Sequence, residues 1–312
     1  MDIPVYLFTG FLESGKSSMM KETLGDPDFN DGTKTLIIAC EEGEIEFEPE
    51  FLKETNSVLY TVEDKDDFTA DLLEELNQKI RPRQVFIEYN GMWSVNDFMD
   101  MEFPLRWVLV QVISTVNAQT FTTYVSNMRS LMYDQLVHSE LILINRCDGT
   151  TKKSFLRSNV KSINKGAQII YESVDGSVNN LPDDELPFDV HAPIIDIHED
   201  DYGLWYMDAL DHPYEYDGKV VRFKGKVEYV EKDKRSFVIG RYAMVCCADD
   251  TSLIGYLVKS GKKVSLVKGD WITLQAKVEI EFDDEYQRNI VVLRAQEIVP
   301  DEEIPNDLVY FS

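Results

Sequence analysis

The chain has 312 residues, of which 44% are hydrophobic and 28% charged, a composition typical of a globular protein long enough for two domains. Its net charge of -26 argues against nonspecific binding to nucleic acid or to an anionic membrane, because both attract basic surfaces. The four cysteines form no spaced framework, and the N-terminus carries neither a basic region nor an apolar run. We therefore expect a cytoplasmic protein without disulfides.

Apolar runs alternate with helical patterns through the first 175 residues. Strands that alternate with helices predict a mostly parallel sheet covered on both faces, so residues 1–175 are expected to form an α/β domain. The expected strands are residues 5–9, 35–39, 85–88, 107–114, 141–145 and 168–171, and the expected helices are residues 16–24, 66–79, 119–132 and 152–164.

The pattern changes near Gly176. Residues 176–204 contain several prolines, acidic pairs and no clear period, so we expect a connector there. Turn-rich segments then separate strand patterns, and this predicts a small all-β barrel of the OB type over residues 205–312, able to fold alone. The expected strands of the barrel are residues 220–230, 236–247, 252–258, 271–280 and 289–298.

Residues 10–17 read G-F-L-E-S-G-K-S and fit the P-loop pattern G-x-x-x-x-G-K-[ST] at every fixed position. The glycines let successive backbone N–H groups point at phosphate oxygens, while Lys16 adds a charge near the β and γ phosphates. The hydroxyl of Ser17 can ligate Mg²⁺, and the helix that follows offers its N-terminus to the anion. Lys16 is expected to contact only phosphate. The predicted phosphate-binding residues are Glu13, Ser14, Gly15, Lys16, Ser17 and Ser18.

A second motif, N-R-C-D at residues 145–148, closes an apolar strand and is close to the guanine-reading N-K-x-D pattern of GTPases. A carboxylate at Asp148 can accept hydrogen bonds from N1–H and the 2-amino group of guanine, a donor pair that adenine lacks. Asn145 would brace the loop or the base edge, and the planar guanidinium of Arg146 can stack on the base. The alternative is an ordinary Asn/Asp turn, but the preceding P-loop favours guanine binding.

An acid, Glu88, ends the expected strand at residues 85–88, three residues before Gly91. Glu88 can hold Mg²⁺ through water, and the N–H of Gly91 can approach a γ-phosphate. The alternative is a capped strand end. Lys16, Ser17 and Glu88 form the predicted catalytic set, in which Ser17 and Glu88 serve Mg²⁺. No residue can be named to position the attacking water, so slow hydrolysis is expected.

Together these motifs resemble the CobW-like GTPases of the SIMIBI class, relatives of the nickel-inserting chaperones of urease and hydrogenase. The resemblance covers residues 1–175 and includes Phe11 and Leu12 of the loop, residues 87–91 and residues 135–148. It implies an Mg²⁺-dependent GTPase that binds GTP and GDP and couples its nucleotide state to an unknown protein partner. Residues 240–250 resemble instead the β domain of YcgQ-type proteins, which implies a fold but little about function.

The sequence departs from the family pattern in three motifs, one of which is the family's cargo-metal motif. Family members usually carry N-E-x-G-E in the first switch, where residues 40–44 read C-E-E-G-E, and V-D-A where residues 116–118 read V-N-A. The family's C-x-C-C motif, thought to hold the cargo metal, usually zinc, has no counterpart in residues 56–63. We therefore predict no tight zinc site in residues 1–175. A GTP-dependent metallochaperone and a nucleotide-responsive adaptor with little catalysis remain the alternatives.

Other candidate metal ligands are weaker. The acidic run at residues 41–50 could hold a hard cation, but such runs are more often solvated, mobile loops. Cys246 and Cys247 are adjacent on an expected strand and point to opposite faces, which favours burial over shared ligation. The four histidines, His138, His191, His198 and His212, show no ligand spacing.

Overall fold

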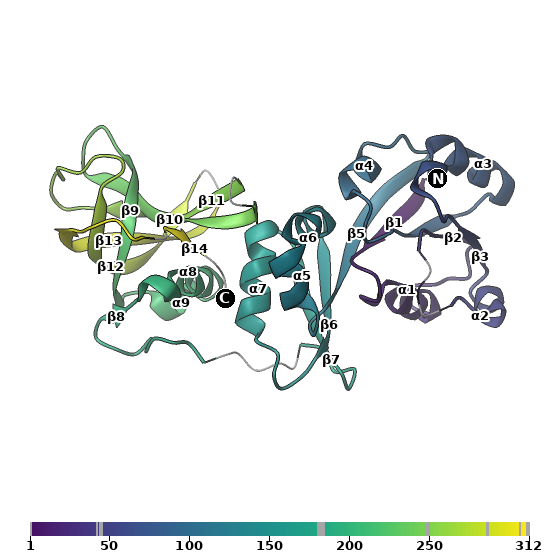
Figure 1. The fold of residues 1–312 in the computed structure, drawn as a ribbon, viewed down its shortest axis with the longest axis horizontal. Helices are drawn as coiled ribbons and strands as arrows, with labels where there is room; N and C mark the ends of the chain where they lie inside the picture. Colours follow the sequence, from purple (N-terminus) through teal and green to yellow (C-terminus); the bar gives the residue numbers. More distant parts are fainter. Residues whose placement is uncertain are drawn as a thin grey trace. The chain divides into compact units, whose positions relative to one another are not determined.

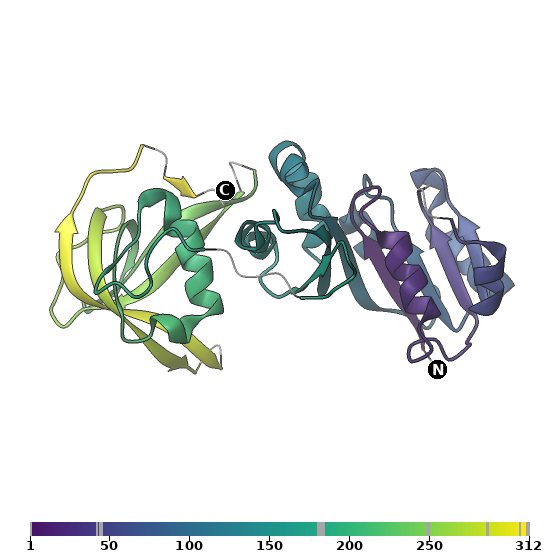
Figure 2. The ribbon, with the colours of Figure 1, turned by 90° about the horizontal axis from the view of Figure 1, so that it is seen from below.

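The computed structural model describes residues 2–41, 43, 46–179, 185–247, 250–284, 287–305 and 307–309. The chain forms two compact units, Met1–Leu156 with Ile163–Pro182 and Arg157–Ser162 with Asp183–Ser312. Figures 1 and 2 show each unit from two directions. The side chains of Cys246 and Cys247, like residues Glu42 and Glu44 of the acidic run, lie outside the described part of the chain.

The first unit is built on a seven-stranded sheet of order β3-β2-β4-β1-β5-β6-β7, in which every pairing is parallel (Figure 1). A sheet of this kind is typical of P-loop NTPases and confirms the predicted α/β class. Its strands are β1 (Ile3–Thr9), β2 (Thr35–Ala39), β3 (Ser57–Thr61), β4 (Gln84–Glu88), β5 (Trp107–Asn117), β6 (Leu141–Cys147) and β7 (Gln168–Ser173).

Helices cover both faces of this sheet, and each face has its own core. Successive side chains of a strand point to opposite faces, so Phe8 and Phe86 pack with α1 on one side. Leu7 and Ile87 pack with α3 and α4 on the other side. The helices are α1 (Lys16–Gly25), α2 (Pro49–Glu54), α3 (Ala70–Ile80), α4 (Val95–Met99), α5 (Phe121–Asn127), α6 (Arg129–Leu136) and α7 (Lys153–Ile163).

Three details differ from the sequence prediction. Strand β3 was not expected, because it is an edge strand with half-exposed residues and its apolar run, residues 58–60, is short. Helix α3 begins at Ala70 rather than residue 66, since the Thr69 side chain accepts a hydrogen bond from Leu72 N (3.2 Å) and a 3₁₀ turn, η1 (Lys65–Asp67), precedes it. The expected helix at residues 119–132 is two helices, α5 and α6, broken where Met128 leaves helical geometry.

The second unit is a closed five-stranded barrel, which confirms the predicted all-β domain. The strands run in the order β9-β10-β11-β13-β12, and β9 pairs with both β12 and β10 to close the ring. Only β11 and β13 pair in parallel among these five. The bounds are β9 (Val220–Val230), β10 (Ser236–Cys247), β11 (Asp250–Lys259), β12 (Trp271–Asp283) and β13 (Arg288–Pro300).

Short elements complete this unit. Two-residue strands, β8 (Ile195–Asp196) and β14 (Leu308–Val309), add to β9 and β10. Helix α8 (Tyr202–Asp211) lies against the barrel (Figure 2), with Trp205 packed 4.8 Å from the Phe223 ring, centroid to centroid. The 3₁₀ turn η2 (Glu199–Asp201) and α9 (Pro213–Tyr216) flank α8. The barrel core therefore includes a helix that precedes the first barrel strand.

Part of the expected connector, residues 176–204, packs into this barrel core. Phe188, Ile195, Ile197 and Tyr202 are buried there, and the Tyr202 hydroxyl donates to Ile254 O (3.0 Å). A domain start at residue 205 remains a prediction, and it would divide α8 and remove these side chains. The packing favours a start near residue 185.

The two boundaries predict different behaviour of isolated fragments. A fragment of residues 185–312 is expected to unfold cooperatively, and one of residues 205–312 to lose most of its stability. Each buried apolar side chain removed contributes about 1.5–3 kcal/mol, and a whole domain is stable by only about 5–15 kcal/mol. Thermal unfolding of both fragments, followed by circular dichroism, measures the difference. Equal cooperativity and equal midpoints would favour the boundary at 205.

Candidate nucleotide site

The P-loop joins the carboxyl end of β1 to the start of α1, and its two glycines adopt conformations that other residues rarely take. Gly10 has φ 123° and Gly15 has φ 105°. A Cβ atom on Gly10 would lie 2.3 Å from Thr115 O, and one on Gly15 would lie 2.5 Å from Asn145 Nδ2. Both glycines are therefore required for the loop to pass between the carboxyl ends of β5 and β6.

Lys16 lies inside this loop, with a side chain only 1% exposed. Its ammonium donates to Gly10 O (2.8 Å) and Phe11 O (3.0 Å) and forms an ion pair with Glu41. The expectation that Lys16 contacts only phosphate is therefore wrong, because three protein groups contact it. These contacts hold the charge at the loop, where an anion bound by the loop amides would meet it.

Ser17 and Glu88 lie together, as a shared Mg²⁺ site would require. The Ser17 hydroxyl donates to Glu88 Oε1 (2.6 Å), and Glu88 is buried at the end of β4. Burial raises the pKa of the Glu88 carboxyl above its ordinary value, although the hydrogen bond from Ser17 and the charge of Lys16 act in the opposite direction. A hydroxyl and a carboxylate are oxygen donors that suit Mg²⁺, so the residues fit that ion.

Gly91 brings the loop after β4 against the P-loop. A Cβ atom on Gly91 would lie 2.5 Å from Gly10 O and 2.7 Å from Phe11 Cα. Only glycine lets the two backbones meet at this distance. Its N–H donates to Glu41 Oε2 (3.1 Å) and so points at the same place as the Lys16 ammonium.

Glu41 corrects the prediction that the acidic run is a solvated loop. Its side chain is 9% exposed and contacts both Lys16 and Gly91. Glu46, Glu48 and Glu50 are exposed, although Glu48 accepts a hydrogen bond from Lys21 (2.6 Å). The position of Glu41, just beyond the carboxyl end of a central parallel strand, was the signal in the sequence that sets it apart from the rest of the run.

The predicted base loop contacts the P-loop directly. Asn145 Nδ2 donates to Ser14 O (2.7 Å), and Arg146 donates to Glu13 O (2.7 Å). The buried Oδ1 of Asn145 accepts no hydrogen bond within the described residues, so it can still receive one from a ligand. Asp148 is half-buried, and hydrogen bonds from Thr150 lower the pKa of its carboxyl below its ordinary value.

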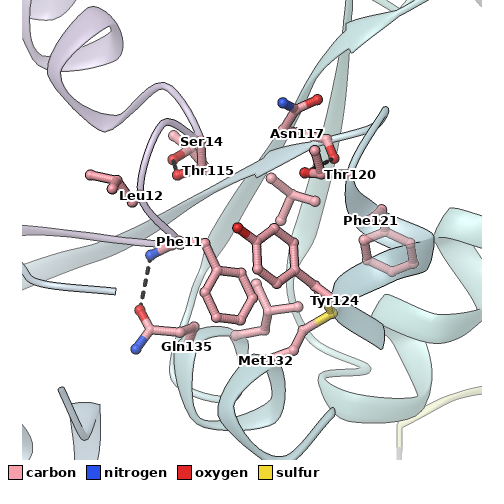
Figure 3. A pocket seen from close by; sticks show the side chains of 13 residues that line it. Phe11, Leu12, Ser14, Thr115, Asn117, Thr120, Phe121, Tyr124, Met132 and Gln135 are labelled. Atoms are coloured by element: carbon pink, nitrogen blue, oxygen red, sulfur yellow. Dashed lines mark hydrogen bonds between the residues drawn. The ribbon is translucent and has the colours of Figure 1, made fainter. Parts of the chain in front are cut away.

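Two residues of α6 support the site and were missed by sequence reasoning. Gln135 Oε1 accepts from Gly10 N (3.0 Å; Figure 3), and its Nε2 donates to Trp93 O (3.0 Å). Asp134 accepts from Val95 N (2.6 Å) at the start of α4. Both lie just beyond the helix expected over residues 119–132, in the part of α6 that the sequence prediction left out. Their placement side by side within a mainly apolar turn was the only available signal.

The phosphate side of the loop and an apolar pocket are separate. Figure 3 shows the apolar pocket, in which the Phe11 ring stacks on Tyr124 with a centroid distance of 4.0 Å. Asn117, which replaces the family's Asp, lines this pocket and not the phosphate side. The phosphate-side pocket is lined by Glu13, Gly15, Lys16, Ser17, Ser18, Glu41, Gly43, Glu88 and Arg146.

Comparison with family models identifies both parts of the chain. Residues 4–171 match the CobW/HypB/UreG nucleotide-binding domain. The chain belongs to the CobW/HypB/UreG family. Residues 178–311 match the DUF1980 C-terminal domain. The resemblance of the two parts to separate families, the first of them a family of P-loop GTPases with metallochaperone relatives, is thus confirmed.

Several solved structures are similar at low identity. Zn(II)-bound YjiA GTPase from E. coli is 18% identical, with 82% of this chain and 89% of that chain covered and a TM-score of 0.43. Hydrogenase maturation factor HypB from Archaeoglobus fulgidus is 16% identical, with 56% and 82% covered and a TM-score of 0.39. A small single-stranded DNA binding protein from Mycoplasma pneumoniae is 14% identical, with 27% and 96% covered and a TM-score of 0.20. None of the curated proteins matches the chain.

Two further features are absent from the described residues. No three His, Cys, Asp or Glu side chains gather among them in a way that could hold a metal ion. No helix in the described part of the chain is long and apolar enough to cross a membrane.

Proposed function

We propose that this member of the CobW/HypB/UreG family binds GTP with Mg²⁺, hydrolyses it slowly and couples its nucleotide state to a protein partner. The observation that supports this most is the convergence of Lys16, Ser17, Glu88 and Gly91 at the carboxyl ends of β1 and β4. Phosphoryl transfer depends mainly on positioning and on neutralising charge, and these groups are suited to both tasks.

Each group has a role in this proposal. Lys16 and the N–H of Gly91 contact the γ-phosphate, and the loop amides at Glu13, Ser14 and Gly15 contact the other phosphates, with Ser18 at the edge. Ser17 and Glu88 would hold Mg²⁺, which would supply neutralisation of phosphate charge. Asp148 accepts from the guanine edge.

Slow hydrolysis is supported by the hydrogen bonds of Gln135. In other GTPases a glutamine can orient the attacking water. Here both ends of the Gln135 amide are engaged, one by Gly10 N and the other by Trp93 O. This amide therefore holds the loops together and is not available to water.

The experiment that tests the proposal is phosphate release from GTP and from ATP, each with Mg²⁺ or with EDTA. We expect slow release from GTP that needs Mg²⁺ and is lost in Ser17→Ala, which removes a proposed Mg²⁺ ligand together with its hydrogen bond to Glu88. Equal release from ATP would contradict the proposal. Tight GTP binding with no release would favour the adaptor alternative.

The metallochaperone alternative makes a different prediction about zinc. Burial raises the pKa of the Cys147 thiol to about 11. Burial, with Glu88 and Glu41 nearby, raises the pKa of Cys40 further. Zinc is bound by thiolates rather than thiols, so we expect no stoichiometric, submicromolar zinc site in residues 1–175, with or without GTP. Competition against a zinc indicator measures this. One tightly held equivalent would restore the metallochaperone alternative.

A further inference from the structure

The Glu41 carboxylate is bound by the two groups that a P-loop enzyme directs at a γ-phosphate. One oxygen pairs with the Lys16 ammonium, and the other accepts from Gly91 N (3.1 Å). In such enzymes the terminal phosphate accepts from the loop lysine and from the N–H of a glycine that follows the Mg²⁺-holding acid, here Glu88. A carboxylate has the same charge sign and the same acceptor chemistry as a phosphate oxygen pair.

The backbone just before Glu41 is held at the site by two hydrogen bonds. Cys40 N donates to Glu88 O (2.9 Å), and Cys40 O accepts from Asn90 Nδ2 (3.1 Å). On the other side, Gly43 lies near the proposed Mg²⁺ ligand, since a Cβ atom on it would be 3.9 Å from Ser17 Oγ. Glu41 is thus placed by the hydrogen bonds of its neighbour Cys40 and not by its side chain alone.

We propose that Glu41 competes with the γ-phosphate for Lys16 and Gly91 and so sets the preference of the site between GTP and GDP. This inference rests on the proposed function, because it concerns the same nucleotide. GTP has to displace the carboxylate, since two anions cannot share one N–H and one desolvated ammonium. GDP carries no γ-phosphate, so Glu41 can keep both contacts while GDP is bound.

The consequence concerns the first switch. Displacement by GTP removes the Glu41 side chain from Gly91 and Lys16, whereas GDP leaves it in contact with both. The position of Glu41 then depends directly on whether a γ-phosphate is bound, because one anion replaces the other. A bound partner that holds Glu41 away from Lys16 would favour GTP binding.

The test compares Glu41→Gln with the parent, using full-length protein, Mg²⁺, and GTP and GDP as separate titrants. The substitution keeps the size and one acceptor oxygen but removes the charge, so we expect GTP to bind about tenfold more tightly and GDP within about twofold of the parent. Glu41→Ala should shift the ratio in the same direction. Glu63→Gln is the matched control, because Glu63 lines the adjoining pocket beside Glu41 but is exposed to solvent.

The outcomes separate this inference from the proposed function. A GTP-to-GDP affinity ratio that rises in both Glu41 variants and not in Glu63→Gln supports the competition. An unchanged ratio, a ratio that rises equally in the control, or weaker GTP binding in both Glu41 variants overturns it while GTP binding by the parent stands. If the parent binds neither nucleotide, the proposed function fails and this inference fails with it.

Discussion

Lys16→Ala is expected to reduce GTP affinity by at least about a hundredfold, because a charge-assisted contact to phosphate is lost inside a loop whose amides cannot replace it. The Lys16 side chain is buried at the loop and points at the place that Gly91 N–H also faces. Equilibrium titration with a fluorescent guanine nucleotide measures the loss. A variant that binds GTP as well as the parent would contradict the P-loop assignment.

The same substitution is expected to lower the stability of the protein without nucleotide. Removing the ammonium leaves the Glu41 carboxylate with Gly91 N as its remaining partner in a nearly buried place, at a cost of about 2 kcal/mol. Chemical unfolding of the first unit measures this change. Glu41→Gln added to Lys16→Ala should restore most of the stability and none of the GTP affinity, because it removes the unpaired charge but not the need for Lys16. A double variant as unstable as the single one would show that the ion pair contributes nothing.

Asp148→Asn is expected to change the base preference of the site from guanine to xanthine. The amide NH₂ of Asn is a donor, and it would face the N1–H and 2-amino donors of guanine. The 2-oxo group of xanthine, in contrast, can accept a hydrogen bond from it. A site built to pair with hydrogen-bond donors rejects a mismatched partner strongly, so we expect GTP affinity to fall by about a hundredfold and XTP affinity to rise. Asn keeps the Oδ1 acceptor for Thr150 N and Oγ1, so the loop itself should persist.

Titrations of the Asp148→Asn variant with GTP, XTP and ATP measure this exchange. The parent protein and Thr150→Ala serve as controls, the latter because it removes the hydroxyl that helps hold Asp148 without changing the carboxylate. If XTP binds the variant no better than the parent, the N-R-C-D motif does not read the base.

Much of the first domain could be predicted because its central strands are buried on both faces. Strands β1, β2 and β4 are continuous apolar runs, and each lies within two residues of its expected range. The edge strand β3 could not be found in this way, since its side chains are half-exposed. The split between α5 and α6 depends on the conformation of Met128, and no glycine or proline marks it.

The candidate site was predictable where spacing carries the chemistry. Lys16 and Ser17 follow from the loop pattern alone, and the structure places Glu88 against Ser17 as expected. The contacts of Glu41 and Gln135 were not predictable, because they join segments far apart in the chain, and the sequence offers only the positions of these residues as weak signals. Gln135 reaches Gly10 across 125 positions, and no local pattern encodes such a contact.

The barrel illustrates the same limit. Its strands follow from alternation and turn residues, and the five expected ranges all fall within β9 to β13. The acidic, proline-containing segment before it gave no period, yet Ile195 and Tyr202 fill the barrel core. Single apolar residues in an irregular segment carry too little pattern to reveal that they are buried.

The most direct test of guanine-nucleotide binding at the P-loop is one equilibrium measurement, the affinity of the full-length protein for GTP and for ATP in the same Mg²⁺ buffer. Asp148 offers acceptors to a donor pair that only guanine presents, so we expect GTP to bind at least about a hundredfold more tightly than ATP. Equal affinities, or a preference for ATP, would contradict the account.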